Sequence, residues 1–245
     1  MQKQHRKNNS YKYSYRGSLN SYTVFENNEI MTDIPELKPD SAIIVRLDGK
    51  GLTRRFRTNE LSNEELKTAM EYVVREIEKH CLIKFAYSTS DEVSLLIKNE
   101  YINEKEVRNR LEKLLTYLSG YVSSLFTISL YGNNSTTEKE AVSFDARAII
   151  IEKNRIRKYF LCRQQFAIWQ FIEKVCNHFG FKKQAYTIEQ IDKELQNKGK
   201  KWDNYPRNIR YGFVGYYNES DQWKVEAAKD FLTEWDDYSV AIDRF

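Results

Sequence analysis

Three acidic residues lie at positions from which they could bind a metal ion. Asp48 follows a short apolar run, and Asp91 and Glu92 lie between two further runs rich in β-forming residues. Carboxylates that converge repel one another unless a cation neutralises them, and hard oxygen ligands at a hydrated edge suit Mg²⁺. The Gly49 carbonyl is a further candidate ligand, because glycine lets the backbone approach an ion closely. Two such ions about 4 Å apart could activate an attacking oxygen and stabilise a leaving oxygen in phosphoryl transfer.

The same residues also have a simpler structural interpretation. Asp and Gly after a strand are common in turns, and an Asp-Glu pair at a hairpin is ordinarily solvated. On spacing alone, both interpretations stay open.

Basic residues in the same part of the chain could bind phosphates. Lys50 and Gly51 offer a charge and backbone N–H groups to a triphosphate, although they do not form the G-x-x-x-x-G-K-[ST] pattern of a P-loop. Arg110 and Lys113 are three residues apart, on one face of a predicted helix. Glu112 beside them equally supports a solvated helix face.

A further basic segment is interleaved with aromatic residues at the start of a predicted helix. For an RNA ligand, this segment offers phosphate contacts and base stacking. In an ordinary core helix, the aromatic residues would face the core and the basic residues would face water. The segment comprises Lys153, Arg155, Arg157, Lys158, Tyr159, Phe160, Arg163 and Trp169.

Hydrophobic periodicity predicts the elements that position the carboxylates. The predicted order is β-α-β-β-α-β, the split βαβ arrangement of an α+β, ferredoxin-like fold with an antiparallel sheet and both helices on one face. The strands that carry the carboxylates are central neighbours in this arrangement, so the carboxylates should converge at one edge. The predicted strands are 41–46, 83–88, 93–97 and 141–151, and the predicted helices are about 63–80 and 104–126.

A helical elaboration is predicted to follow this core. Residues 155–179 show the pattern of a third helix, and a capping-box pattern at 187–190 opens a shorter one. Residues 210–217 are predicted to form a strand. Trp223 and Trp235 are expected to pack back onto the body.

The chain shows no evident linker, so we expect one catalytic domain over residues 17–245. Within it, the split βαβ core covers about 41–151 and the C-terminal elaboration about 152–245. Residues 1–16 form a basic arm, which fits either a solvated terminus or a segment that contacts phosphate.

Composition narrows the class of protein. An apolar share of 41% and a charged share of 30% in 245 residues exclude a disordered or collagen-like chain. The net charge of +4 is too mild to indicate a nucleic-acid partner by itself. Three cysteines imply no disulfide framework. They fit a reducing compartment, so we expect a cytoplasmic protein. The sequence has no apolar run of membrane-spanning length, so we expect no membrane partner.

Four short motifs resemble those of a known enzyme family. RLDGKGLT at 46–53 resembles R-L-D-G-[RK]-x-F-[TH], and KFAYSTSDEVS at 84–94 resembles K-F-A-Y-x-Q-S-D-E-[IV]-S. FDAR at 144–147 resembles F-D-[GA]-R, and Arg163-Gln164 resembles the start of W-R-Q-x-D-A-x-x-N. The sequence is thus similar to the tRNA-histidine guanylyltransferase family, and more closely to its guanylyltransferase-like branch, over roughly residues 17–217.

This resemblance implies a polymerase-palm-like core that adds nucleotides in the 3′-to-5′ direction to the 5′ end of a tRNA. A nucleoside triphosphate, ATP or GTP, first activates the 5′ end, and the 3′-hydroxyl of an incoming nucleotide then attacks it. In the guanylyltransferase-like branch, addition is template-directed and repairs 5′-truncated tRNAs. Family members are commonly homotetramers.

The resemblance also implies roles for individual residues. It assigns catalysis to Asp48, Asp91 and Glu92, and the two Mg²⁺ ions to Asp48, Gly49 and Asp91. The residues implied near nucleotides are Lys50, Gly51, Leu52, Thr53, Ser90, Arg110 and Lys113. The residues implied to contact RNA are Arg147, Lys153, Arg155, Arg157 and Arg163.

The sequence departs from the family motifs at several positions. Thr89 replaces Gln, and Cys162 replaces Trp. On the helix that carries Arg163, Phe166 replaces Asp and Gln170 replaces Asn. A polar helix face has therefore become partly apolar beside an intact set of carboxylates.

Two alternatives to a tRNA-directed polymerase stay open. The same carboxylates would serve a palm-type nucleotidyl transferase or cyclase that needs no RNA. Phe166, Gln170 and the basic arm would fit a non-catalytic RNA-binding homologue.

Overall fold

The computed structural model describes residues 29–30, 40–52, 63–80, 83–98, 107–132, 141–182 and 186–243. They contain a seven-stranded, fully antiparallel sheet with the strand order β1-β5-β2-β4-β3-β6-β7. The strands are β1 (Glu29–Ile30), β2 (Ser41–Gly49), β3 (Ile83–Thr89), β4 (Glu92–Ile97), β5 (Phe144–Glu152), β6 (Phe213–Tyr217) and β7 (Trp223–Ala227). The helices are α3 (Asn63–Glu76), α4 (Val107–Tyr131), α5 (Ile156–Phe179), α6 (Ile188–Gln196), α7 (Arg207–Tyr211) and α8 (Asp236–Asp243), with short 3-10 turns at Ile77–His80, Lys153–Arg155 and Trp202–Asn204.

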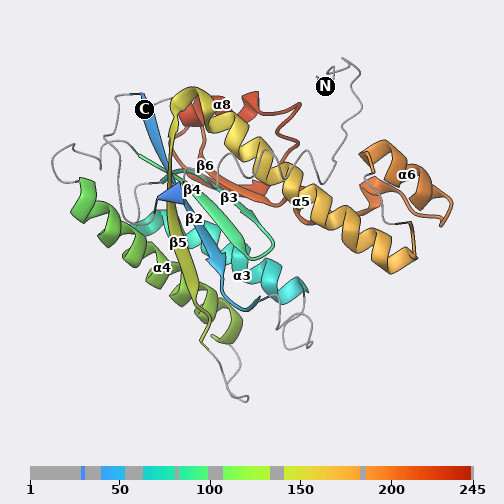
Figure 1. Ribbon diagram of the computed structural model, residues 1–245, viewed down its shortest axis with the longest axis horizontal. Helices are drawn as coiled ribbons and strands as arrows, with labels where there is room; N and C mark the ends of the chain where they lie inside the picture. The colour runs from blue at the N-terminus through green and yellow to red at the C-terminus, as the bar shows by residue number, and fades with distance from the viewer. Residues whose placement is uncertain are drawn as a thin grey trace.

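The predicted split βαβ core is confirmed. Its elements follow the order β2-α3-β3-β4-α4-β5, and its strands lie side by side as β5-β2-β4-β3. Helices α3 and α4 cover one face of the sheet, and α5 and α8 cover the other (Figure 1).

Both faces of the central strands are buried, which explains why their sequences are mostly apolar, with Arg46, Lys84 and Ser94 as buried polar exceptions. In β2, Ile43 and Val45 pack toward α3 and α4, whereas Ala42 and Ile44 pack toward α5. A strand buried on both sides favours apolar residues on both faces, so the regular alternation of a half-exposed strand is absent.

The C-terminal elaboration extends the sheet as well as covering it. β6 pairs with β3, and β7 pairs with β6. Trp235 lies in the buried cluster between α5 and α8, and the Trp223 indole donates a hydrogen bond to the Val74 carbonyl of α3 at 3.0 Å. The expectation that both tryptophans pack onto the body is confirmed.

Several predicted elements differ from the structure at their ends, and the strand predicted at 141–151 begins only at Phe144. The first strand continues from 46 to Gly49, because Asp48 and Gly49 still pair with β5. The predicted strand at 210–217 begins only at Phe213, because Arg207–Tyr211 forms the short helix α7. The second helix ends at Tyr131 rather than near 126. The capping box at Thr187 is confirmed, since Thr187 and Gln190 exchange both hydrogen bonds.

The sequence shows no uninterrupted apolar run of membrane-spanning length, yet one part of helix α4 is apolar enough overall to qualify. By length and composition, Leu111–Tyr131 is long and apolar enough to cross a bilayer. Its inner side packs on α3 and on β5, where the Ser123 hydroxyl accepts a hydrogen bond from the Phe144 N–H at 2.9 Å.

Candidate active site

The predicted convergence of carboxylates is present at one end of the sheet. Asp48, near the end of β2, lies directly opposite Glu92 on β4 and Asp145 on β5. All three side chains line a cavity between this end of the sheet and α5, together with Arg163 of that helix. Three neighbouring strands therefore each contribute one carboxylate to the same face.

The turn between β3 and β4 places a fourth acidic residue beside them. It consists of Ser90 and Asp91, and Ser90 adopts the left-handed region at φ 51°. Non-glycine residues rarely adopt this conformation, and it is often found at functional sites. The Gly49 N–H donates to the Asp91 carbonyl at 2.9 Å, which fastens the turn to the end of β2.

Gly49 is required here by packing. A Cβ atom at this position would collide with the Leu52 side chain and would lie 3.3 Å from the Asp91 carbonyl oxygen. Leu52 is completely buried, so moving its side chain would disrupt core packing. The glycine therefore lets the β2 end and the hairpin turn approach each other.

The aspartates at this edge are destabilised in their charged forms. Burial, followed by the neighbouring carboxylates of Glu92 and Asp145, raises the pKa of Asp48. Burial and the nearby Asp48 carboxylate raise the pKa of Asp91. A cation bound between the aspartates would relieve this repulsion.

Glu92 makes a buried ion pair with Arg163. The guanidinium Nη2 of Arg163 donates to Glu92 Oε2, and the side chains are only 4% and 11% exposed, respectively. Asp145 similarly pairs with Arg147 at 3.1 Å. These pairs balance two of the four acidic residues and leave Asp48 and Asp91 as the carboxylates best placed for a cation.

The protein oxygens at this edge supply only part of the coordination that Mg²⁺ needs, and substrate would supply the rest. Within the described ranges, no group of three or more His, Cys, Asp or Glu side chains is arranged to hold a metal ion. The two aspartates and the Gly49 backbone supply hard oxygen donors, and Mg²⁺ commonly completes its coordination with water and substrate phosphates. The residues present therefore fit a substrate-assisted magnesium site.

The cavity brings together most of the residues predicted for catalysis and nucleotide binding. Its volume is about 860 Å³, which is ample for a nucleotide. The lining residues are Asp48, Gly49, Lys50, Gly51, Thr89, Ser90, Asp91, Glu92, Asp145, Arg147, Arg163, Phe166 and Gln170.

Other predicted nucleotide-binding residues lie elsewhere. Leu52 packs in the core between the sheet and α3, so its role is structural. Lys113 is an exposed residue of α4, on the far face of the sheet from α5, and does not line the cavity. Thr53 lies outside the described residues, and the side chain of Arg110 is likewise not described.

Three residues predicted to contact RNA are remote from the carboxylates. β5 runs from Asp145 at the cavity to Glu152 at the opposite end of the sheet, and Lys153 and Arg155 follow it. Seven residue steps along a strand span roughly 23 Å. The Arg157 guanidinium donates to the Leu232 carbonyl at 3.4 Å. This basic cluster therefore does not belong to the cavity, because α5 begins at the far end and runs back toward it.

Sequence reasoning missed Asp145 as a site residue and gave Gln164 no role. The FDAR motif contains Asp145, and the pairing of the fourth strand with the first could have placed it opposite Asp48. Gln164 acts structurally: its amide accepts from the Phe231 N–H and donates to the Lys229 carbonyl, both at 2.7 Å.

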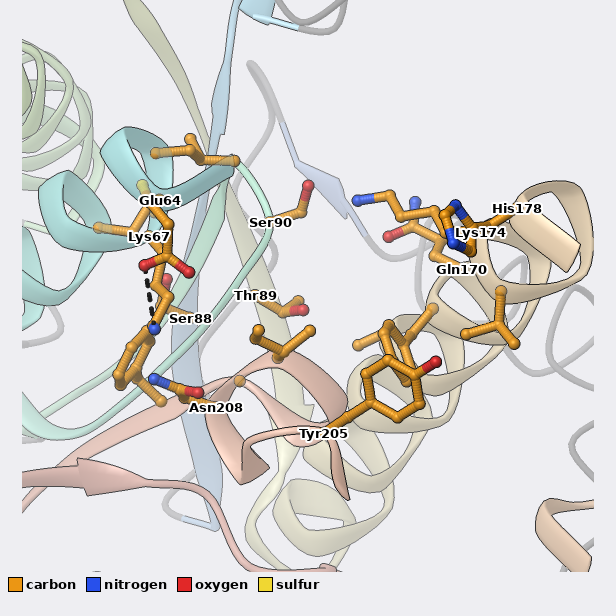
Figure 2. A pocket seen from close by; sticks show the side chains of 18 of the residues that line it. Glu64, Lys67, Ser88, Thr89, Ser90, Gln170, Lys174, His178, Tyr205 and Asn208 are labelled. Carbon is orange, nitrogen blue, oxygen red and sulfur yellow. Dashed lines mark hydrogen bonds and ion pairs between the residues drawn. The ribbon is translucent and has the colours of Figure 1, made fainter. Parts of the chain in front are cut away.

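A second cavity of about 410 Å³ adjoins the first and shares Thr89, Ser90 and Gln170 with it. Figure 2 shows Gln170, Lys174 and His178 side by side on α5, across the opening from Ser90. The opposite wall comes from α3, where Lys67 pairs with Glu64 at 3.3 Å. The remaining lining is largely apolar: Leu66, Met70, Ala167, Phe171, Val175, Phe179, Ile209 and Phe213.

Comparison with known proteins gives a consistent family. The sequence model of the family described as tRNAHis guanylyltransferase (Thg1) matches residues 22–152, more than half of the chain. A search of curated protein sequences found no significant match.

Solved structures with the same fold cover most of the chain. A bacterial tRNA(His) guanylyltransferase (Thg1)-like protein in complex with ATP matches with a TM-score of 0.65 and 21% identity, covering 91% of this chain and 97% of that one. A bacterial Thg1-like protein in complex with GTP matches over the same shares, with a TM-score of 0.62 and 20% identity. The tRNA(His) guanylyltransferase from Saccharomyces cerevisiae matches with a TM-score of 0.57 and 17% identity, covering 84% of this chain and 96% of that one.

Proposed function

Because the chain belongs to the tRNAHis guanylyltransferase family of nucleotidyltransferases, we propose that it adds nucleotides, in the 3′-to-5′ direction and under the direction of a template, to the 5′ end of tRNA. The reaction class is nucleotide addition of the guanylyltransferase type. The proposal adds the direction of synthesis, the use of a template, the dependence on Mg²⁺ and the repair of truncated 5′ ends.

The observation that carries this proposal is the group of carboxylates at the end of β2. Asp48 faces two acidic neighbours, and the hairpin turn holds Asp91 against the backbone of Gly49. Such mutual repulsion destabilises the protein, and a catalytic demand for cation binding explains why it persists. A nucleotidyl transferase needs such a site, since the phosphates that react carry concentrated negative charge.

The residues of the cavity would have different roles in the reaction. Asp48, Asp91 and the Gly49 carbonyl would hold Mg²⁺, which when bound supplies charge neutralisation to the reacting phosphates. Lys50 stands next to these donors at the cavity wall and is placed to bind a triphosphate. Arg163 holds Glu92 by its buried ion pair and so keeps the Glu92 charge from adding fully to that of Asp48.

The resemblance to the family implies two chemical steps at this site. In the first, a 5′-phosphate oxygen of the tRNA attacks the α-phosphorus of a nucleoside triphosphate, and pyrophosphate leaves. In the second, the 3′-hydroxyl oxygen of an incoming nucleotide attacks the activated 5′ phosphorus, and the activating nucleoside monophosphate leaves. Positioning of the reactants and stabilisation of charge contribute most of the catalysis in such reactions.

RNA would approach the cavity at the part of its wall that carries Arg147 and Lys50. Arg147 lies on β5 beside the carboxylates and is partly exposed, with 37% of its side chain accessible. Lys50 is also exposed at this edge. The cluster at 153–157 lies at the other end of the sheet, so any contact it makes with RNA would be far from the reacting end. We propose that it contacts the body of the tRNA.

A templated-extension assay tests the proposal. A tRNA lacking its first 5′ nucleotide is incubated with Mg²⁺ and all four radiolabelled triphosphates, beside a sample without RNA. We expect addition of the nucleotide complementary to the opposing base of the 3′ strand. Changing that opposing base should change the added nucleotide. Addition of one fixed nucleotide whatever the opposing base would contradict template direction, and products formed without RNA would indicate a different nucleotidyl transferase.

A further inference from the structure

Phe166 places an aromatic ring in the wall of the carboxylate cavity. It lies on α5, half buried, and lines the same space as Asp48 and Asp91. Among the described residues that line this cavity, it is the one aromatic side chain. The other lining residues are glycines or carry polar or charged groups.

The ring is held in place by two neighbours. The Arg163 guanidinium carbon lies 5.3 Å from its centroid, within the range of a cation–π contact. The Trp169 ring lies 5.8 Å away and is tilted by 33°. Because Arg163 is in turn paired with Glu92, the ring is fixed relative to the strands that carry the carboxylates.

This aromatic residue is a departure from the family motif, which has Asp at the same helix position. With Asp, the wall would carry one more negative charge beside Glu92 and Asp145. With Phe166, the wall gains a flat apolar face instead. Such a face in a polar, hydrated cavity gains free energy when another flat apolar group covers it.

We infer that Phe166 is the stacking platform for the nucleobase of the nucleoside triphosphate whose phosphates bind at Asp48 and Asp91. The inference rests on the proposed function for the substrate class, since the nucleobase is the flat apolar part of these substrates. Phosphates drawn to the carboxylate edge by Mg²⁺ leave the base free to cross the cavity toward α5. Stacking tolerates any base, as a templated enzyme requires.

Binding measurements isolate the base from the phosphates. Isothermal titration calorimetry compares ATP, GTP and inorganic tripolyphosphate, in the presence of Mg²⁺, with the wild-type protein and with Phe166→Leu. Leucine keeps an apolar side chain against Arg163 and Trp169 but removes the ring. We expect the Kd of both nucleotides to rise about fivefold or more, the range that stacking on one aromatic ring supports. The Kd of tripolyphosphate should stay unchanged, and Phe166→Trp should restore nucleotide binding.

Phe179→Leu is the matched control, because Phe179 lies on the same helix and lines the second, largely apolar cavity. If Phe179→Leu weakens nucleotide binding and Phe166→Leu does not, the base occupies the second cavity and the inference is wrong. The inference is equally overturned if Phe166→Leu weakens tRNA binding alone.

The two proposals fail in distinguishable ways. Wild-type protein that binds neither nucleotides nor tripolyphosphate would contradict the proposed function itself. Nucleotide binding that is unaffected by Phe166→Leu, in a protein that still extends tRNA, would contradict only the stacking role. A circular dichroism spectrum and thermal melt of each variant show whether a change in Kd reflects altered folding.

Discussion

Replacing Asp48 by Asn should stabilise the protein in the absence of Mg²⁺ while abolishing its activity. Asp48 lies directly opposite two other acidic residues, and its pKa is raised by burial and by these neighbours. Its charged form therefore opposes folding at neutral pH. Asparagine keeps the shape of the side chain and removes the charge.

The magnitude follows from the pairing of the strands. Like charges directly opposite each other in a sheet cost roughly 0.2–1 kcal/mol per pair. Asp48 makes two such pairs, but Arg163 and Arg147 balance the partner carboxylates, and the Asp48 side chain is only partly withdrawn from water, so the lower part of the range applies. We expect a gain of about 0.5–1 kcal/mol, which raises the Tm of a domain of this size by roughly 1–4 °C.

Thermal melts in EDTA and in excess Mg²⁺ measure this effect. In EDTA, Asp48→Asn should melt above the wild-type protein. In Mg²⁺ the difference in Tm between the two proteins should shrink or change sign, because the wild type gains binding free energy that the variant lacks. Asp40→Asn is the control, since Asp40 is an exposed residue immediately before the first residue of β2, at the opposite end from Asp48. A variant less stable than wild type by more than about 1 kcal/mol in EDTA would refute the electrostatic reasoning.

Three further predictions concern the same edge. The stabilisation by Asp48→Asn should be largest near pH 7 and shrink as pH falls through the raised pKa of Asp48, because the protonated wild type then resembles the variant. Urea unfolding in EDTA from pH 7 to pH 4.5 measures this. A difference in unfolding free energy that stays constant over this range would contradict the prediction. Glu92→Gln should lower the unfolding free energy by about 3–5 kcal/mol, since it leaves the buried Arg163 guanidinium without its counter-charge. A loss below about 1 kcal/mol would show that the ion pair of Glu92 with Arg163 is well solvated. Gly49→Ala should lower the midpoint of urea unfolding by the equivalent of about 1–3 kcal/mol, because its Cβ collides with Leu52; an unchanged midpoint would mean that the turn yields without strain.

The core of the fold could be predicted from the sequence because its local signals agree. Helical spacing in α3, α4 and α5 and β-rich runs in the strands specify the element order, and the split βαβ topology then fixes the strand order. β7 was missed, since the sequence Trp223–Ala227 carries two charged residues and only partly buried apolar ones. Its pairing with β6 depends on contacts with distant parts of the chain.

The candidate site could be predicted where it depends on neighbouring strands. The convergence of Asp48 with Asp91 and Glu92 follows from topology alone. The ion pair of Glu92 with Arg163 could not be foreseen, because 71 residues separate the partners and the register of α5 against the sheet decides the contact.

The basic segment at the start of α5 shows the limit of composition as a guide. Lys153 and Arg155 share a run with Arg163 in the sequence, yet only Arg163 reaches the cavity. The direction in which α5 crosses the sheet separates them, and no local pattern encodes that direction.

The most direct test of the central claim measures nucleotide addition by the wild type, Asp48→Asn, Asp91→Asn and Asp40→Asn on one tRNA lacking its first 5′ nucleotide. All four proteins should be folded by circular dichroism. We expect Asp48→Asn and Asp91→Asn to lose nucleotide addition by a factor of at least about 10³, equivalent to roughly 4 kcal/mol of transition-state stabilisation, while Asp40→Asn keeps wild-type activity. Full activity in either Asp48→Asn or Asp91→Asn would contradict the claim that this edge of the sheet catalyses the reaction.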